Sequence, residues 1–360
     1  MRVTLGLFTH NHEDFVIAAL RGVLGQTYCP LQILITDDAS TDRTPLLIRA
    51  EVENYQGPHE VYFCANAKNQ GLSVNINQHM EMATGELYVI ASGDDVSYPH
   101  RIQRLVEAFC ASGPDTMSLH SNARTVDQNG SGLGLFFTTP PPLWRAESMS
   151  DARQFHGVWV QGATHAWNRR VFEVFGPLPA TVNYEDWVIP FRSGLIGRIV
   201  YVDDVLVDYR LHESNLWFGR VDVNSGYRRW YADKLSGVEQ EIAVLRCKDK
   251  DLVVAKAELS DRQSLVVALQ EINREVLADA MASRELLGNV VPLRRKLLVT
   301  SKYFGRRRSV KQDLVWFLTY FWPSAYLSYI RLRALVAGKE FRVVDGRCFG
   351  RKLVARLFGS

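Results

Sequence analysis

The chain has 360 residues, of which 47% are hydrophobic and 22% charged, so it can bury a full core and is long enough for two domains. This composition excludes a globally disordered chain. Five widely spaced cysteines without a C-x-x-C pair argue against a disulfide framework or a zinc site. The first residues lack the basic start and long apolar run of a secretory signal, so we expect a cytosolic protein.

The net charge of +3 conceals a strong division along the chain. Residues 291–360 hold 16 Lys or Arg against 3 Asp or Glu, so this tail carries +13 and the first 290 residues carry −10. A basic tail joined to an acidic body indicates an anionic partner for the tail. Membrane lipid and nucleic acid are the two candidates.

The first hundred residues alternate short apolar runs with segments of helical spacing. Strands are expected at Val3–Thr9, Leu31–Thr36, Glu60–Asn66 and Leu87–Ser92. Helices are expected at Asp14–Leu24, Pro45–Tyr55 and Leu72–Met82. This alternation predicts an α/β fold with a doubly wound, mostly parallel sheet.

Beyond this half, the pattern is interrupted and then changes. A loop rich in Gly, Pro and Thr is expected from Asn129 to Pro142, and apolar segments at Gly157–Trp167 and Ile199–Val207 continue the sheet to about Arg210. From Gly237 to Leu287 helix formers dominate. We therefore expect a catalytic α/β domain over residues 1–215 and a helical accessory region over residues 216–300.

The tail, residues 301–360, is basic and rich in aromatic residues. From Leu314 to Ile330 it has 17 consecutive uncharged residues interrupted by Pro323, slightly fewer than the roughly 20 needed to span a bilayer. Arginines flank this block, which favours a segment that lies on an anionic membrane surface. The alternative is that its aromatic rings pack against the body or a second subunit, which leaves a homo-oligomer open.

Polar residues follow the expected strands where each strand ends, which is where ligands bind in open α/β sheets. The four clusters are Thr9-His10-Asn11, Asp37-Asp38-Ala39-Ser40, Asn69-Gln70-Gly71 and Gly93-Asp94-Asp95. Any single cluster could be a loop with capping residues. Four at one sheet edge indicate a ligand site.

Two of these clusters carry carboxylates with distinct expected chemistry. Asp94 and Asp95 would repel each other unless a positive group lies beside them, and Mg²⁺ or Mn²⁺ commonly takes one or two carboxylates plus phosphate and water. This predicts a nucleoside diphosphate site, although either residue could instead cap a helix near Pro99. Asp38 can accept hydrogen bonds from a nucleotide base or ribose, or can serve as a turn or cap residue.

The order of the motifs resembles family 2 glycosyltransferases of the glycosyltransferase-A fold, over about residues 3–215. The similar segments are Phe8–Glu13, Gln26–Tyr28, Asp37–Thr44, Asn69–Gly71 with Asn75, Gly85–Glu86, Asp94–Asp95, Asn183–Trp187 and Tyr209–His212. Each is weak alone, but their order and spacing are specific together.

The resemblance implies a role for each matching residue. Asp186 would be the catalytic base, Asp95 the metal ligand and Asp38 a contact of the nucleotide base. The expected nucleotide-binding residues are Thr9, Asn11, Glu13, Asp38, Asn69 and Asp94. His212 is a further candidate for the metal, and Glu185 and Trp187 are expected to support the acceptor.

The expected function is an inverting transfer of a sugar from a nucleoside-diphosphate donor, UDP-linked, to a saccharide or lipid-linked saccharide, with Mn²⁺ or Mg²⁺. We expect it at the inner face of a bacterial cell membrane, in surface-polysaccharide assembly, with no nucleic-acid partner. One alternative is a nucleotidyltransferase, which should show a Gly-rich basic loop where this chain has Thr9–Glu13. The other is a membrane-tethered or nucleic-acid-binding scaffold without catalysis.

Overall fold

The computed structural model describes residues 1–141, 144–145, 152–212, 215, 227–259 and 262–287. These fall in two compact units, Met1–Leu211 with Arg246–Asn273, and His212–Leu245 with the chain from Arg274 onward. The expected membrane-associating tail, residues 301–360, lies outside the described residues. Within the described part, no helix has both the length and the apolar character needed to cross a membrane.

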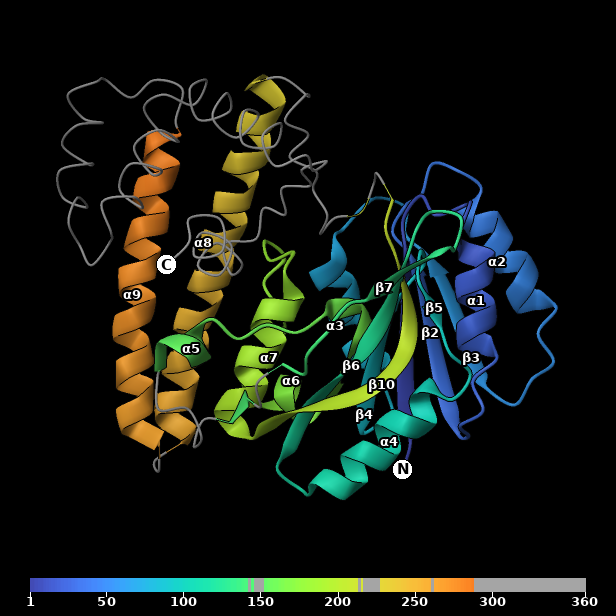
Figure 1. Ribbon diagram of the computed structural model, residues 1–360, viewed down its shortest axis with the longest axis horizontal. Helices are drawn as coiled ribbons and strands as arrows, with labels where there is room; N and C mark the ends of the chain where they lie inside the picture. The colour runs from blue at the N-terminus through green and yellow to red at the C-terminus, as the bar shows by residue number, and fades with distance from the viewer. Residues whose placement is uncertain (142–143, 146–151, 213–214, 216–226, 260–261, 288–360) are drawn as a thin grey trace. The chain divides into compact units, whose positions relative to one another are not determined.

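The first half of the first unit confirms the predicted alternation of strands and helices (Figure 1). Its elements are β1 (Val3–Thr9), α1 (Val16–Leu24), β2 (Leu31–Asp37), α2 (Thr44–Glu53), β3 (Glu60–Ala65), α3 (Leu72–Met82) and β4 (Leu87–Ser92). Helix α1 begins two residues later than expected, because the N–H groups of Phe15 and Val16 both bond to the His12 carbonyl in a turn.

The second half departs further from the expectation. Its elements are β5 (Val96–Ser97), α4 (Arg101–Ser112), β6 (Thr116–Val126), β7 (Gly132–Leu135), β8 (Trp144–Arg145), α5 (Ala152–His156), the 3₁₀ turn η1 (Gly162–Thr164), β9 (His165–Asn168), α6 (Arg170–Phe175), α7 (Glu185–Ile196) and β10 (Arg198–Arg210). The predicted loop at 129–142 contains β7, whose backbone pairs with β6. Only the end of the apolar segment 157–167 is a strand, because η1 turns the chain first.

The sheet runs in the order β3-β2-β1-β4-β9-β6-β10-β5, with β7 beside β6 and β8 beside β10. Strands β3, β2, β1 and β4 are parallel, as predicted, and so are β6 and β10. Strands β5, β7, β8 and β9 join antiparallel, so the sheet is mixed rather than mostly parallel. Strand β7 follows its partner β6 through a short turn, and such a connection reverses the chain where a helical crossover would keep the strands parallel.

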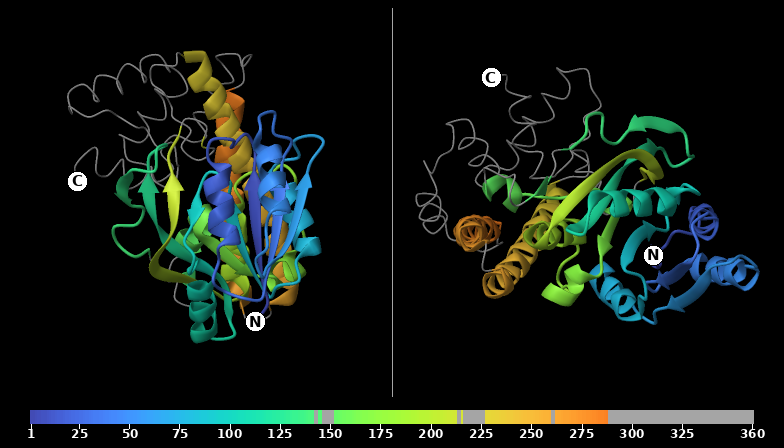
Figure 2. Two further views of the ribbon diagram at one scale, coloured as in Figure 1. Left: turned by 90° about the vertical axis from the view of Figure 1, so that its right-hand side faces the viewer. Right: turned by 90° about the horizontal axis from the view of Figure 1, so that it is seen from below.

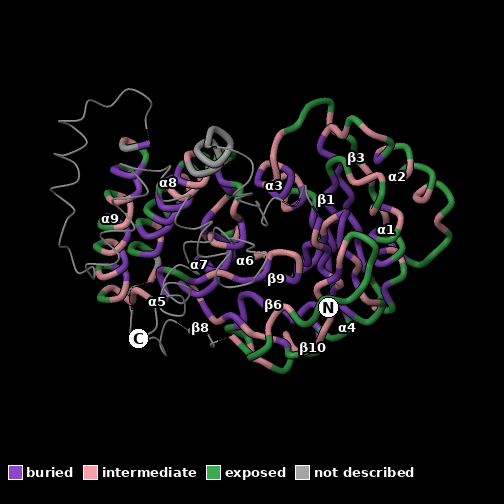
Figure 3. The backbone as a smooth tube through the Cα atoms, turned by 45° about the horizontal axis from the view of Figure 1, so that its top comes forward, coloured by how far each residue is buried: buried purple, intermediate pink, exposed green. Residues whose placement is uncertain are grey.

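The hydrophobic core fills the sheet face covered by α1, α2 and α4 (Figure 1, Figure 2). Alternate residues of β1 point into it, represented by Leu5 and Leu7, and meet Leu20 of α1 and Ile102 of α4. Helix α3 covers the opposite face, where buried His79 stacks on Phe8. Strands β1, β2 and β4 are buried along almost their whole length, whereas the edge strand β3 and strand β7 are largely exposed (Figure 3).

Two long helices, α8 (Tyr227–Glu258) and α9 (Gln263–Leu286), confirm the predicted helical character of this region. The first half of α8 and the last half of α9 form the second unit through a small apolar cluster. Its buried members are Val238, Ile242, Leu245, Ala280 and Leu287. The middle of the hairpin, Arg246–Asn273, belongs instead to the first unit.

Candidate functional site

Parallel pairing brings the loops after β1, β2 and β4 to one edge of the sheet. The backbone N–H of Asp38 donates to Thr9 O at 2.9 Å, and the N–H of Gly93 donates to Phe8 O at 2.9 Å. The ladders therefore continue one residue past each strand and fix the polar clusters side by side. This is the edge at which the sequence places its ligand-binding residues.

Three of the predicted nucleotide-binding residues tie the first loop to the second. The hydroxyl of Thr9 donates to Asp37 Oδ1 at 2.9 Å, and the N–H of Thr41 donates to Asn11 Oδ1 at 2.8 Å. Glu13 Oε2 accepts from the backbone N–H of Arg43 at 3.1 Å. Their side chains thus organise these loops.

Asp38 is buried and holds the loop between β3 and α3. Its Oδ1 accepts the N–H of Gln70 at 2.8 Å and the Asn66 amide at 2.9 Å, and its Oδ2 accepts the N–H of Gly71 at 2.8 Å. Burial alone would raise its pKa, but these hydrogen bonds outweigh burial and lower the pKa below its usual value. Asp38 is therefore ionised. Asn69 lies exposed in the loop that Asp38 holds.

Asp94 and Asp95 are both buried just after β4. The pKa of Asp95 lies well above its usual value, first because of burial and second because of the charge of Asp94. His12 Nε2 approaches Asp94 Oδ2 at 3.9 Å, and the Ser92 hydroxyl hydrogen-bonds to Asp94 Oδ1. The backbone N–H of Arg210 donates to Asp95 Oδ1 at 2.8 Å.

Two buried arginines stand near this carboxylate pair. The guanidinium of Arg101 donates to the carbonyls of Ile90 and Ala163, and burial lowers its pKa to about 10 against the opposing effect of Asp95. Arg210 Nε donates to Asp94 O at 3.0 Å. These cations lower the proton affinity of Asp95, yet its pKa stays raised, so the pair still lacks part of its compensating positive charge.

A divalent cation fits this donor set. Within the described ranges, no group of three or more His, Cys, Asp or Glu side chains gathers as a metal site. Mg²⁺ and Mn²⁺ do not need one, because they bind through one or two carboxylates and take phosphate and water for the rest. Asp95, with Asp94 beside it, is the residue that would hold the ion.

A second carboxylate pair opens helix α7. Glu185 and Asp186 are buried, and neither oxygen of Asp186 accepts a hydrogen bond from another residue in the described part of the chain. Burial raises the pKa of Glu185 to about 7. Burial first and Glu185 second hold the pKa of Asp186 well above its usual range. The amino end of a helix favours negative charge, which partly offsets the cost of burying the pair.

The loop before α7 reaches the other loops of the site. The Ser73 hydroxyl at the start of α3 hydrogen-bonds to the Val182 carbonyl, and a Cβ built on Gly71 would lie 3.7 Å from Asn183 Oδ1. Trp187 is half-buried beside Tyr184, with ring centroids 5.9 Å apart. The acidic start of α7 thus belongs to the same end of the sheet as the loop that Asp38 holds.

His212 is buried and begins the second unit. Its backbone N–H donates to Asn215 Oδ1. Its role at the metal stays a prediction.

Sequence reasoning gave no role to several side chains around the carboxylates. Tyr209 and Arg210 appear in a recognised motif, but nothing in the sequence indicated that Arg210 would bind Asp95. Arg101 stands at a helix start, two residues after Pro99, and carries no sequence signal of burial. Gln161 and Gly162, next to Asp186, also lie in a segment that resembled only an apolar run.

Comparison with known proteins agrees with this arrangement. Residues 5–174 match the model of glycosyl transferase family 2. An uncharacterized glycosyltransferase of Nostoc is 29% identical over 220 residues, which cover 60% of this chain and 66% of the relative. An uncharacterized protein of Mycobacterium tuberculosis is 26% identical over 211 residues, which cover 58% of each chain. The chain thus spans less than two thirds of the length of both relatives.

Among solved structures, S. aureus TarS 1–349 in complex with UDP is similar, with a TM-score of 0.51 and 16% identity. The likeness covers 96% of this chain and 95% of that one and concerns the fold alone. It agrees with the mixed α/β sheet of the glycosyltransferase-A type. The sequence match thus assigns residues 5–174 of the chain to glycosyl transferase family 2, and the likeness of fold agrees with it.

Proposed function

We propose that the protein transfers a sugar from a nucleoside-diphosphate donor to a hydroxyl of a saccharide or lipid-linked saccharide, with inversion at the anomeric carbon. One observation carries the proposal: a buried carboxylate, Asp186, whose oxygens accept no hydrogen bond from another described residue, in the same unit as the Asp94–Asp95 pair. Burying such a group costs free energy unless a ligand uses it. Neither alternative, a nucleotidyltransferase or a scaffold, accounts for this second acidic site.

In the proposed reaction, Asp186 takes the proton of the acceptor hydroxyl while that oxygen forms a bond to the anomeric carbon. The bond between that carbon and the diphosphate oxygen breaks, and the nucleoside diphosphate leaves. The raised pKa of Asp186 suits it to hold this proton. A divalent ion at Asp95, when bound, would neutralise charge on the leaving diphosphate.

The nucleotide is proposed to lie across the loops that follow β1 and β2. Asp38 is ionised, and its oxygens retain acceptor capacity beyond the hydrogen bonds they make in the protein. We propose a uridine donor because the resemblance suggested it, and UDP is the ligand named for the TarS structure. Thr9, Asn11, Glu13 and Asn69 would shape this site by fixing the loops.

The test is a panel of UDP- and GDP-sugars with Mn²⁺ or Mg²⁺, scored by release of nucleoside diphosphate and by the anomeric configuration of the product. Asp186→Asn keeps the size of the side chain but cannot take up the proton, so turnover should fall roughly 10²- to 10⁴-fold while donor binding survives. Glu185→Gln is the matched control, since it alters the adjacent carboxyl and should cost less. Near-normal turnover of Asp186→Asn would exclude it as the base.

The matched family segment ends before α7 begins, so the role of Asp186 rests on its own surroundings. A loss of donor binding in Asp186→Asn, with the fold intact, would instead place this carboxylate in the donor site.

We further propose that the protein works at the inner face of the cell membrane, in surface-polysaccharide assembly. The supporting observations are the +13 charge of residues 291–360 and the aromatic block at 314–330. Removing residues 314–360 should reduce sedimentation with anionic liposomes and lower activity on a lipid-linked acceptor more than on a soluble one. Equal sedimentation of both proteins would contradict this localisation.

A further inference from the structure

The turn η1 lies directly against the acidic start of α7. The N–H of Val160 donates to the Asp186 carbonyl at 3.2 Å. A Cβ built on Gly162 would lie 2.9 Å from Glu185 Oε1 and 3.7 Å from Asp186 Oδ2, so only glycine fits without displacing a carboxyl group. On the far side of the turn, Arg101 donates to the Ala163 carbonyl at 2.9 Å. The turn is thereby fixed between the two buried acidic sites.

Gln161 directly precedes this turn and is only 5% exposed. Its carboxamide lies beside the hydroxyl of Tyr209 and lowers the pKa of that hydroxyl, but its amide nitrogen makes no hydrogen bond of good geometry to any residue that the structure describes. A buried donor of this kind lowers the stability of the protein by roughly 1–3 kcal/mol when it makes no hydrogen bond. A buried donor without a partner calls for an explanation, and a bound ligand that accepts its hydrogen bond supplies one.

Tyr209 connects the turn with the other carboxylate pair. It directly precedes Arg210 in β10, and the backbone N–H of Arg210 binds Asp95 Oδ1 at 2.8 Å. Burial first, and then the nearby charges of Asp95, Asp94 and Asp186, raise the pKa of the Tyr209 hydroxyl. Gln161 directly precedes Gly162, which lies against Glu185 and Asp186, and Arg101 near Asp95 binds Ala163 of the same turn, so Gln161 lies between the proposed base and the proposed diphosphate site.

The geometry points to Gln161 as the residue that binds a hydroxyl of the transferred sugar, through its buried amide N–H group, which makes no hydrogen bond in the described part of the chain. This inference rests on the proposed function, because in such a transfer the sugar lies between the diphosphate and the base. A carboxamide that donates to a hydroxyl makes a neutral contact, which suits an uncharged hexose or N-acetylhexosamine rather than a uronic acid.

The experiment compares UDP with UDP-sugars on the full-length protein with Mn²⁺. The probes are UDP, UDP-glucose, UDP-galactose, UDP-GlcNAc and UDP-GalNAc, with GDP and GDP-mannose beside them, and affinities are measured by calorimetry. In Gln161→Leu, affinity for the free nucleotide should be unchanged, while affinity for the preferred nucleotide sugar falls roughly 3- to 15-fold. Tyr209→Phe should cause a smaller loss of the same kind.

A fold control separates binding from structure. Gln26 is equally buried, but its amide is fully used, since it donates to the carbonyls of Gly22 and Tyr98 and accepts the N–H of Ile102. Gln26→Leu should therefore lower the thermal midpoint, whereas Gln161→Leu should leave it unchanged or raise it. A lowered midpoint in Gln161→Leu would show that the protein itself satisfies this amide and would overturn the inference.

The two proposals fail in different ways. If wild type binds a nucleotide sugar and Gln161→Leu binds it equally well, the inference is wrong and the proposed function stands. If Gln161→Leu lowers the affinity for free UDP as well, Gln161 serves the nucleotide and not the sugar. If wild type binds none of these nucleotides, the proposed function fails and the inference fails with it.

Discussion

A buried ion pair joins the acidic helix α7 to the long helix α8, and breaking it should cost the protein much of its stability. Arg192 Nε and Nη2 contact the two carboxylate oxygens of Asp251, each at 2.9 Å, and the two side chains are only 2% and 3% exposed. Arg192 also donates to the Gly176 carbonyl at 2.8 Å. The pair is therefore bidentate, buried and hydrogen-bonded on its remaining side.

Asp251→Ala would leave the Arg192 guanidinium buried without its counter-charge. Removing one partner of a buried pair typically costs about 3–5 kcal/mol, because the surviving charge keeps its desolvation penalty. The double variant Arg192→Met/Asp251→Leu removes both charges at similar volume and should recover most of that loss. The free energy of unfolding is to be measured by urea denaturation of the full chain, with each variant compared at its midpoint.

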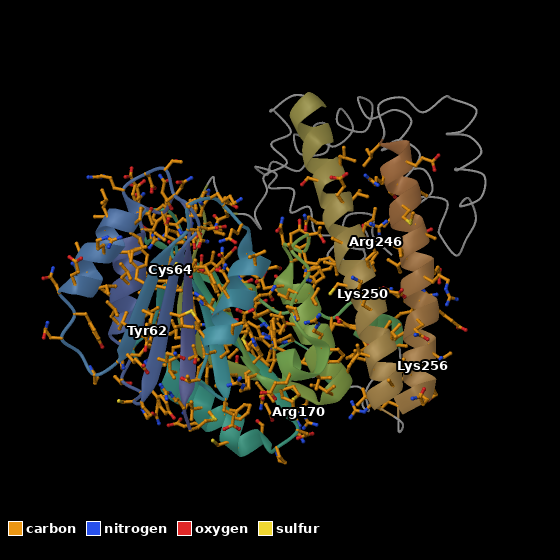
Figure 4. All side chains as sticks on the ribbon, turned by 180° about the vertical axis from the view of Figure 1, so that it is seen from behind. Tyr62, Cys64, Arg170, Arg246, Lys250 and Lys256 are labelled. Atoms are coloured by element: carbon orange, nitrogen blue, oxygen red, sulfur yellow. The ribbon has the colours of Figure 1, made fainter. Side chains whose placement is uncertain are left out.

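The matched control is Asp249→Ala, two residues away on the same helix and exposed. It should change stability by no more than about 0.5 kcal/mol. The exposed Lys250 on α8 (Figure 4) offers a second control of the same kind. A loss below about 1 kcal/mol in Asp251→Ala, or a double variant as unstable as the single one, would refute the reasoning.

Three further predictions concern groups nearer the site. Burial lowers the pKa of His79 to about 3 from 6.5, so its contribution to stability is full above pH 6.5 and is lost below it as the unfolded chain takes up the proton. The stability gap between wild type and His79→Gln should therefore narrow by about 1 kcal/mol per pH unit between pH 6 and 5; a constant gap would contradict the buried neutral imidazole. Asp38→Asn replaces one carboxylate oxygen with an N–H₂ group that faces a loop amide. It should lower the free energy of unfolding by about 1–3 kcal/mol and speed hydrogen exchange of the backbone amides between β3 and α3. Unchanged exchange would show that this loop does not depend on Asp38. Burial first and the charge of Asp94 second raise the pKa of Asp95, and Asp94→Asn removes that charge. The variant should therefore stabilise the metal-free protein by on the order of 1 kcal/mol, and Mn²⁺ with UDP should no longer stabilise it. Retained stabilisation by Mn²⁺ would exclude Asp94 from the site.

The first half of the fold was predictable because its apolar periods are local. Strand β1 shows a local apolar alternation and strand β4 an apolar run, and parallel pairing then fixes where their polar ends lie. The second half was not predictable in the same way. Strand β9 has only four residues, and its antiparallel place between β4 and β6 depends on partners far away in the sequence.

The same distinction applies to the site. Asp38, Asp94 and Asp95 follow strands directly, so their gathering at one edge follows from topology. Arg101, by contrast, is buried only because α4 packs where its guanidinium can reach the Ile90 and Ala163 carbonyls. A local pattern cannot show such a contact, since an arginine at a helix start is normally exposed.

Helix α7 shows why the first compact unit extends beyond the α/β sheet. The Lys248 ammonium donates to the His156 carbonyl at 2.7 Å and lies 4.7 Å from the centre of the Phe191 ring of α7. His156 in turn hydrogen-bonds to Asn273 of α9 at 3.0 Å. With the ion pair of Arg192, these contacts anchor α7 at its middle, two turns from the carboxylates at its start.

A chain cut at residue 215 would lose every one of these partners and leave Arg192 without its counter-charge. The first unit accordingly includes Arg246–Asn273, although this segment follows the sheet by dozens of residues. Because the position of Asp186 depends on where α7 is held, the segment Arg246–Asn273 is part of what places the proposed base. Stability of the helical hairpin and activity at the sheet edge should therefore fall together in variants of this contact, even though none of its residues lies at the acidic start of α7.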